Sequence, residues 1–513
     1  MILILKNVIM KMSGLGKKYP YITPRGIPDK PYNFSRRQKM KLTYDVADKP
    51  KGAKLLTLAL QQMLAILAAT IAVPMIVGNG MTPAAAMFGA GAGSIVYLLF
   101  TKGRSPVFLG SSFAFLGPMA TAFAGGVSMQ LGFLGLILGA VLAGLVYVVI
   151  ALVVKAVGVE WINKIMPPVV IGPTVAIIGL SLAGNAVGDL QKGDVAIDGA
   201  AVASPYVAIL CGLITLFTVM LCASFGKKTM KLIPFIIGIA VGYAVALLCT
   251  IIGNCADINE LKLIDLDVFS NYMLKDGSIS TETFFQLPKF TFIEALKGTG
   301  ELTGTYFLTI FAAYVPVAFV VFAEHVADHK NLSSIIERDL LKDPGLSNTL
   351  LGDGIGSMAG AFFGGSPNTT YGESIACVAI TGNASSITIL FAAFGCMIFS
   401  FLTPLVALID SIPSCVMGGV CISLYGFISV SGLKMLQKVD LGINRNLFTA
   451  SVILIAGIGG LSLTFGDITI TTIATALILG IITNTVLAGS EANDAKQADS
   501  ETKQIEMKKN GKK

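Results

Sequence analysis

The stretch Gly364-Gly365-Ser366-Pro367-Asn368-Thr369-Thr370-Tyr371-Gly372-Glu373 places small and polar residues between two long apolar segments. Thr and Tyr favour extended backbone, and Pro367 disfavours helix in the residue before it. Non-helical backbone is tolerated at membrane depth only where protein or a water-filled cavity surrounds it. The stretch therefore predicts a broken membrane span, with a short extended part followed by a half-helix.

A second stretch of this kind is Leu109-Gly110-Ser111-Ser112-Phe113-Ala114-Phe115. Each break lies about fifty residues after a polar residue of an earlier span, Gln61 in one case and Glu324 in the other. A further internal echo has an offset of roughly 245–248 residues and pairs Pro168, Gly172, Gly179 and Gly184 with Pro413, Gly418, Gly426 and Gly432. These echoes predict a seven-span unit that occurs twice, and two copies of an odd unit are inverted. Paired interrupted segments in an inverted repeat indicate a transport site near the midplane.

The composition agrees with a membrane protein. Of the 513 residues, 54% are hydrophobic and only 13% are charged, whereas about 25% are charged in typical soluble domains. The net charge of +7 does not indicate nucleic-acid binding, because the basic residues gather in short loops and at the two tails. The eight cysteines occur singly, without the spacing of a metal site or a disulfide framework.

A helix that crosses the bilayer needs about 20 mostly apolar residues. By this criterion we expect about fourteen spans, at residues 55–79, 81–101, 106–123, 127–154, 167–187, 203–224, 232–252, 305–328, 347–365, 367–382, 386–409, 413–432, 446–462 and 468–489. Alternate loops are rich in Lys and Arg, which predicts that both termini are cytoplasmic. The basic residues of these loops include Lys102, Arg104, Lys155, Lys227, Lys228, Lys231, Lys330, Lys342, Lys434 and Arg445.

Two acidic residues stand out within the spans, Glu324 in the eighth and Glu373 just after the second break. A carboxylate inside the membrane costs about 2.5 kcal/mol or more at a helix centre and is a functional candidate by default. The structural alternatives are a span-end carboxylate for Glu324 and a half-helix cap for Glu373. Asp328 shares the helical face of Glu324. Because two nearby carboxylates cannot both ionise cheaply, the pair is a candidate proton site. Alternatively, Asp328 is a residue of the cytoplasmic helix end.

The only histidines, His325 and His329, are equally compatible with structural and functional roles, and no further ligand pattern supports a zinc site. Two half-helix N-termini would offer free backbone N–H groups, for which the candidates are Phe113 and Gly372. Together with the acceptors Glu324 and Glu373, these donors suit a small planar ligand that has both carbonyl and N–H groups.

At these residues the chain resembles the nucleobase–ascorbate transporter family, also called nucleobase:cation symporter-2, and within it the bacterial uracil permeases. The resemblance runs from about Lys54 to Ala488. Its specific stretches are Leu58-Ala59-Leu60-Gln61-Gln62, Phe108–Phe115, Ala323-Glu324-His325-Val326, Asp339–Leu346 and Pro367–Glu373. The glutamate that ends the last stretch separates the uracil branch from purine members, which usually have glutamine there.

The resemblance implies fourteen spans in two inverted repeats, which form a core domain (55–157 and 305–409) and a gate domain (158–254 and 410–489). An extracytoplasmic loop would occupy 255–304, and the cytoplasmic tails would be 1–54 and 490–513. It also implies an inner-membrane protein, often a homodimer, that imports a nucleobase by proton symport without another cofactor or a metal.

By match with the family, Glu324 and Glu373 would accept hydrogen bonds from the base, and the amides of Phe113 and Gly372 would donate to its carbonyls. Tyr425 matches a position on the gate near the site, and Phe113, Phe115 and Tyr371 are candidates for stacking on the ring, with ordinary packing as the alternative. The chain departs from the family pattern at Gln62 and Asp328, which stand where uracil permeases commonly have His. It also departs after Glu373, at Ser374-Ile375-Ala376 and Thr381-Gly382.

We expect the core to move against the gate in an elevator-like or rocking motion, with proton binding near Glu324 neutralising the site. The six echoed glycines would give the gate a smooth surface for this motion. The alternatives are a xanthine or purine permease of the same family, an anion transporter of the same repeat architecture, and a membrane enzyme. The last is disfavoured because the spans contain no nucleophile–base pair or metal cluster.

Overall fold

A computed structural model of the chain describes residues 42–158, 161, 166–197, 200–274, 278–437, 439–465 and 468–488. The predicted tails therefore lie outside the described residues, apart from residues 42–54. The first half of the fold contains α2 (Gly52–Val77), α3 (Pro83–Phe100), β1 (Leu109–Ser111), η1 (Phe113–Phe115), α4 (Leu116–Ala122), α5 (Met129–Val157), α7 (Pro168–Ser181), α8 (Ala183–Leu190), β2 (Ala196–Ile197), β3 (Ala200–Ala201), α9 (Pro205–Phe225), α10 (Lys228–Leu232) and α11 (Pro234–Ala256).

A region of short elements follows and leads into the second half. It contains η2 (Asn259–Leu261), α12 (Asp267–Met273), η3 (Thr281–Thr283), α13 (Thr291–Lys297) and η4 (Thr299–Glu301). The second half contains α14 (Gly304–Ile336), η5 (Leu341–Gly345), α15 (Leu346–Gly364), β4 (Asn368–Thr370), α16 (Gly372–Thr381), α17 (Ser386–Phe399), α18 (Thr403–Asp410), α19 (Ser414–Leu436), α20 (Asn444–Ile458), β5 (Leu463–Phe465), β6 (Ile468–Ile470) and α21 (Thr472–Val486).

Among the described residues, eight helical segments are long and apolar enough to cross a membrane, and several shorter apolar helices accompany them. The prediction of a helical, membrane-spanning chain is confirmed at this level. The two predicted broken segments are also present, since β1 precedes η1 and α4, and β4 precedes α16. The hairpins β2–β3 and β5–β6 were not expected from the sequence.

The prediction of one continuous span at 386–409 is wrong. Helix α17 ends at Phe399, and α18 begins at Thr403 with Pro404 in its first turn. Proline is favoured in the first turn of a helix, but within a continuous helix it lacks an N–H donor and clashes with the preceding turn. The Thr403 N–H instead donates to the carbonyl of Phe284, 3.1 Å away. The break therefore joins this segment to the loop that precedes α13.

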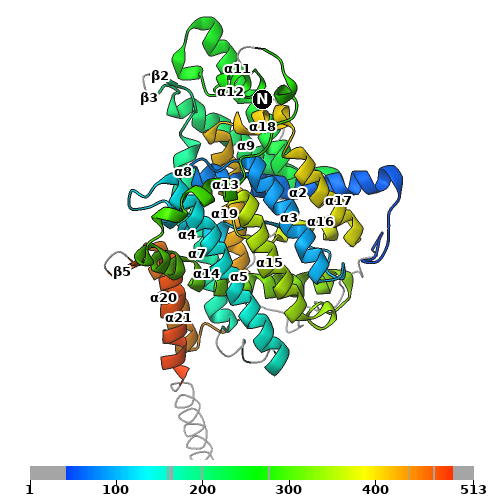
Figure 1. The fold of residues 1–513 in the computed structure, drawn as a ribbon, viewed down its shortest axis with the longest axis vertical. Coiled ribbons are helices and arrows are strands. Elements are labelled where there is room, and N and C mark those ends of the chain that lie inside the picture. Colours follow the sequence, from blue (N-terminus) through cyan, green and yellow to red (C-terminus); the bar gives the residue numbers. More distant parts are fainter. Residues whose placement is uncertain are drawn as a thin grey trace, which may run out of the picture. The chain divides into compact units, whose positions relative to one another are not determined.

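Small residues allow α3 and α15 to pack backbone to backbone, side by side in Figure 1. A methyl group on Gly93 would lie 2.6 Å from the Gly356 carbonyl oxygen, too close for any side chain. The pair α7 and α19 packs in the same way, because a methyl group on Gly172 would lie 2.9 Å from the Gly432 carbonyl oxygen. Close approach of small residues is a common device for joining membrane helices.

This packing corrects the expected role of the echoed glycines. Gly172, Gly179, Gly418 and Gly432 all face neighbouring backbone, so they join α7 and α8 to α19 instead of smoothing an outer surface. Only Gly184 and Gly426 of the six face open space. The echo in the sequence therefore reflects a helix–helix contact.

The region between α11 and α14, expected as an extracytoplasmic loop, contains short helices and is held by aromatic packing. Phe290 and Phe292 stack with ring centroids 5.9 Å apart, and Phe292 also stacks on Phe362 at 4.6 Å. Phe88 of α3 meets Phe290 edge to face at 4.9 Å. These contacts attach the segment around α13 to α3 and α15.

Candidate substrate site at two broken segments

Strands β1 and β4 form an antiparallel pair in which Leu109 faces Thr370 and Ser111 faces Asn368. All six residues of the pair are buried. At one end of the pair the Ser112 N–H donates to the Pro367 carbonyl at 2.9 Å. The pairing satisfies backbone groups that lipid could not hydrogen-bond, and it holds the two half-helices next to each other.

Side chains from neighbouring helices complete the support of this pair. The Ser94 hydroxyl donates to the Leu109 carbonyl at 3.1 Å and accepts from the Leu109 N–H at 2.8 Å. The Asn368 amide donates to the Gly89 carbonyl of α3 at 3.1 Å. The absence of a side chain at Gly110 leaves room for the Tyr371 ring, whose hydroxyl donates to the Ser111 carbonyl at 2.8 Å.

The two half-helices start without a side-chain cap. Ser112 precedes η1 and Tyr371 precedes α16, and neither side chain accepts a hydrogen bond from the first turn. The first N–H groups of a helix have no partner within the helix. A methyl group on Gly372 would meet nothing within 4 Å, so the start of α16 faces open space. Both starts, at Phe113 and Gly372, line one small cavity of about 50 Å³.

Glu324 from α14 and Glu373 from α16 line the same small cavity. Both also line a larger adjoining cavity of about 460 Å³, which falls within the usual range of small-molecule sites. Both side chains are half-buried, and no other side chain of the described residues donates a hydrogen bond to either carboxylate. The site therefore combines two carboxylates that have no side-chain donor with half-helix starts that have no side-chain cap.

Asp328 lines the larger cavity of the candidate site and does not lie at a solvated helix end. Its carboxylate accepts a hydrogen bond from the Thr370 hydroxyl of β4 at 2.8 Å. It also lines the larger cavity together with Glu324 and Glu373. Helix α14 continues to Ile336, two turns beyond the predicted end of the span at 328. The three carboxylates thus share one cavity, and charging all three at once would be costly.

Of the aromatic candidates on the core, Phe113 and Tyr371 line the small cavity, whereas Phe115 packs against another ring. Phe113 lines the small cavity and meets Tyr425 of α19 edge to face, with ring centroids 5.9 Å apart. The Tyr425 hydroxyl is buried and has no hydrogen-bond partner among the described residues. Tyr371 is buried and lines the cavity, but its hydroxyl is engaged by Ser111. Phe115 stacks on Tyr314 at 5.5 Å, as expected for ordinary packing.

Gln62, which departs from the family pattern, braces the second half-helix. Its amide donates to the Ser374 hydroxyl at 2.5 Å, and that hydroxyl accepts from the Phe108 N–H at 3.1 Å. Gln62 therefore links α2 to α16 and to the backbone that leads into β1. It lies beside the ligand-facing groups and not among the residues that line the two cavities.

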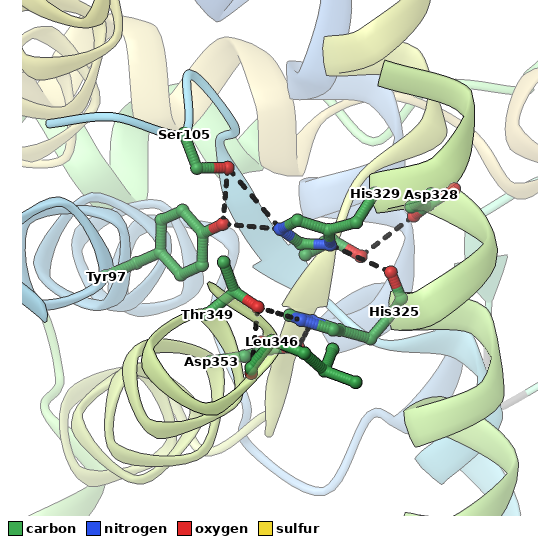
Figure 2. A network of polar contacts seen from close by, with 9 residues as sticks. Tyr97, Ser105, His325, Asp328, His329, Leu346, Thr349 and Asp353 are labelled. Atoms are coloured by element: carbon green, nitrogen blue, oxygen red, sulfur yellow. Dashed lines mark hydrogen bonds and ion pairs between the residues drawn. The ribbon is translucent and has the colours of Figure 1, made fainter. Parts of the chain in front are cut away.

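A polar network that sequence reasoning missed joins α14 to α15 and α3 (Figure 2). His325 Nδ1 lies 2.7 Å from Asp353 Oδ2, and His329 Nε2 lies 2.7 Å from the Tyr97 hydroxyl. All four residues are buried. Asp353 lies in the middle of a predicted span, so the rule that singled out Glu324 and Glu373 also applied to it. The expectation that only two acids stand out within the spans was therefore wrong.

The two histidine rings are stacked, with centroids 4.0 Å apart. Both imidazoles are engaged by oxygen atoms of the protein. The described residues contain no group of three or more His, Cys, Asp or Glu that could hold a metal ion. The geometry thus favours a hydrogen-bonded network over a zinc site.

Comparison with known proteins identifies the family of this chain. A model of the permease family that includes the nucleobase–ascorbate transporters matches residues 53–465. The uracil permease of Bacillus caldolyticus is 38% identical over 452 residues, which are 87% of this chain and 94% of that protein. The uracil permease of Bacillus subtilis is 37% identical over 461 residues, 89% of this chain and 98% of that protein. The uracil permease of Escherichia coli K12 is 33% identical, with 85% and 92% covered.

Solved structures support the fold. The transmembrane domain of the cyanobacterial bicarbonate transporter BicA matches with a TM-score of 0.57 and 15% identity, over 84% of this chain and 97% of that one. The murine anion transporter Slc26a9 in its inward-facing state matches with a TM-score of 0.56 and 10% identity, over 94% of this chain and 75% of that one. From the family match and the sequence identities, we conclude that the chain belongs to the permease family of nucleobase–ascorbate transporters.

Proposed function

We propose that the protein imports uracil across the cytoplasmic membrane by proton symport. The observation that carries this proposal is the pairing of unoccupied acceptors and donors in one cavity. No side chain of the described residues donates a hydrogen bond to Glu324 or Glu373, and the half-helix starts at Phe113 and Gly372 have no side-chain cap. Uracil is a planar ring with two N–H groups and two carbonyls, so it can satisfy both sets at once.

Uracil is favoured over an inorganic anion or a metal cation by the charges of the site and by the names of the related proteins. An inorganic anion would be repelled by the carboxylates of Glu324, Asp328 and Glu373, and a metal cation would be repelled by the backbone N–H groups. The relatives that are 33–38% identical carry the name uracil permease. Glu373, moreover, is the residue that distinguishes the uracil branch within the resemblance.

Proton coupling follows from the charge of the cavity. Three carboxylates share it, and moving an ionised acid through a low-dielectric region is expensive. In our proposal a proton neutralises the Glu324–Asp328 pair, after which the loaded core moves against the gate. The proton gradient would then supply the energy for uracil accumulation.

The proposed architecture has fourteen crossing segments in two inverted seven-span units, with the core at 55–157 and 305–409 and the gate at 158–254 and 410–489. It is supported by the antiparallel pairing of β1 with β4, each followed by a short helix. The packing of α3 on α15 and of α7 on α19 also groups the helices in this way. A homodimer in the inner membrane, with cytoplasmic termini, completes the proposal.

The larger cavity also indicates which side of the membrane it faces. Lys231 and Lys434 line it beside the acids, and both belong to loops that the distribution of basic residues assigns to the cytoplasm. We infer that the structure represents an inward-facing state, in which uracil would leave toward the cytoplasm.

A direct test is uptake of labelled uracil by proteoliposomes with an imposed pH gradient. Accumulation should require an acidic outside, and dissipating the gradient should abolish it. Excess xanthine should not compete; competition as strong as that by unlabelled uracil would instead indicate a purine permease. Thermal stabilisation across a nucleobase panel gives a second readout, since a ligand at about 100 times its dissociation constant adds about 2.7 kcal/mol.

A further inference from the structure

His325 and Asp353 form a close pair that does not line the transport cavity. His325 Nδ1 lies 2.7 Å from Asp353 Oδ2, and His325 Nε2 lies 3.0 Å from the Thr349 hydroxyl (Figure 2). All three side chains are fully buried. His325 follows Glu324 directly on α14, while Thr349 and Asp353 are one turn apart on α15. The pair thus lies immediately behind a proposed ligand-binding carboxylate.

The hydroxyl of Thr349 has one proton and two acceptors within reach. The Leu346 carbonyl oxygen lies 3.1 Å from the Thr349 oxygen, and His325 Nε2 lies 3.0 Å from it. When the hydroxyl donates to Leu346, His325 Nε2 must carry a proton and donate to Thr349, because a carbonyl only accepts. When the hydroxyl donates to His325 instead, Nε2 must carry no proton and must accept that hydrogen bond.

These two arrangements differ by one proton. In the unloaded one, His325 Nδ1–H donates to the Asp353 carboxylate, and the group carries one negative charge. In the loaded one, Nε2 carries a second proton, and the proton between Nδ1 and Asp353 Oδ2 stays in place, so the group is neutral overall. The rotation of the Thr349 hydroxyl preserves the hydrogen bond to Nε2 in both arrangements.

The surroundings favour the loaded arrangement in this structure. Asp353 Oδ1 is buried without a hydrogen-bond partner among the described residues, which is costly for an ionised carboxylate. Glu324 and Asp328 of α14 are close enough to interact electrostatically with Asp353. Tyr97 of α3 and Tyr147 of α5 are also within its electrostatic reach. None of these groups is a cation that would stabilise the negative charge of the unloaded arrangement.

His329 does not extend the pair into a longer proton path. Its Nδ1 lies 2.8 Å from the His325 carbonyl oxygen and must donate to it, while Nε2 faces the Tyr97 hydroxyl at 2.7 Å. The two imidazoles are stacked, with no hydrogen bond between the rings. The exchangeable proton is therefore confined to Asp353, His325 and Thr349.

We propose that His325 and Asp353 form a second proton-binding site of this transporter, separate from the carboxylates that line the cavity, and that Thr349 switches it between loaded and unloaded forms. Loading adds one proton from the aqueous phase to His325 Nε2 while the Thr349 hydroxyl turns to the Leu346 carbonyl, and release reverses both changes. The inference rests on the proton symport proposed above and adds a location for one of the protons.

The test is the number of protons that enter with each uracil in proteoliposomes, measured with an internal pH dye and labelled uracil in the same preparation. Asp353→Asn should lower the ratio by one proton per uracil and should reduce the maximal uracil accumulation that a given pH gradient supports. Exchange of labelled for unlabelled uracil, which needs no net proton movement, should continue. An unchanged ratio in Asp353→Asn would overturn the second site.

The wild-type protein separates this proposal from the general one. If it moves uracil without acidifying the lumen, proton symport itself is wrong. If it acidifies the lumen and Asp353→Asn does so equally, only the second site is wrong. His329→Gln is the matched control inside the same network and should keep the wild-type ratio.

A second pair of variants decides the matter if Asp353→Asn does not assemble. Thr349→Ser keeps the rotating hydroxyl, whereas Thr349→Val removes it at similar volume. Proton-driven uptake should be at least tenfold slower in Thr349→Val than in Thr349→Ser, with uracil exchange equal in the two. Equal proton-driven uptake in both variants would also overturn the proposal.

Discussion

The Thr370 hydroxyl of β4 donates a hydrogen bond to the Asp328 carboxylate of α14 across 2.8 Å. This bond connects a broken segment to the helix that carries Glu324, and it places Asp328 in the cavity instead of at a solvated helix end.

Replacement of Thr370 by Val should leave Asp328 without this donor. Loss of a hydrogen bond to a buried charged group costs about 1–3 kcal/mol, so we expect Thr370→Val to lower the thermal midpoint of the detergent-solubilised protein. Thr388→Val is the matched control, because the Thr388 hydroxyl is buried but has no partner among the described residues. Equal midpoints for the two variants would show that the Thr370 bond contributes nothing to stability.

Glu373→Gln should leave the protein folded and reduce uracil uptake severely. The substitution removes the charged acceptor for a ring N–H, and a hydrogen bond to a charged group is worth about 1.5–3 kcal/mol, or roughly 10- to 150-fold in affinity. The readout is uracil binding and uptake at equal amounts of reconstituted protein. Glu301→Gln, on the exposed segment before α14, is the control and should match the wild type. Wild-type uptake in Glu373→Gln would remove Glu373 from the site.

Gly372→Ala tests whether the start of α16 faces the ligand. The added methyl group would meet no protein atom within 4 Å, so stability should be unchanged while uracil affinity falls at least severalfold. Gly188→Ala on α8 also adds a methyl group in open space, and it should leave both quantities unchanged. Undiminished affinity in Gly372→Ala would mean that the ligand does not approach this amide.

Gly172→Leu tests the backbone contact between α7 and α19. Any side chain at Gly172 meets the Gly432 carbonyl oxygen, which cannot move without shifting the helix. Overpacking of this kind typically costs about 1–3 kcal/mol. We therefore expect a lower thermal midpoint, checked beside Gly426→Leu, where the first side-chain carbon meets no atom within 4 Å. If the two variants have the same thermal midpoint, the close contact is not needed for stability.

Several features of the fold and of the candidate site could be predicted from the chemistry of residues that are close together in the sequence. Pro367 and the polar residues around it identified the broken segments, because few structures tolerate such residues in lipid. Glu324 and Glu373 were found by the cost of burying a carboxylate. The split of the 386–409 segment was less accessible, since it depends on a contact between Thr403 and Phe284 that is distant in sequence.

Other features depend on three-dimensional packing. The echo of Gly172 and Gly432 was visible, but only the structure shows that these residues face each other and not a sliding surface. The partner of His325 is Asp353, 28 residues away on another helix, and no local pattern predicts that pairing. The short helices between α11 and α14 also carry no distinctive periodicity, and they are positioned by aromatic contacts such as Phe292 on Phe362.

The central claim is that uracil is held between two carboxylates and two backbone N–H groups in the middle of the membrane. A structure of the protein with bound uracil tests it most directly. The ring should lie within about 2.7–3.2 Å of the carboxylates of Glu324 and Glu373 and of the N–H groups of Phe113 and Gly372. Uracil bound elsewhere, with both carboxylates facing only water, would contradict the claim.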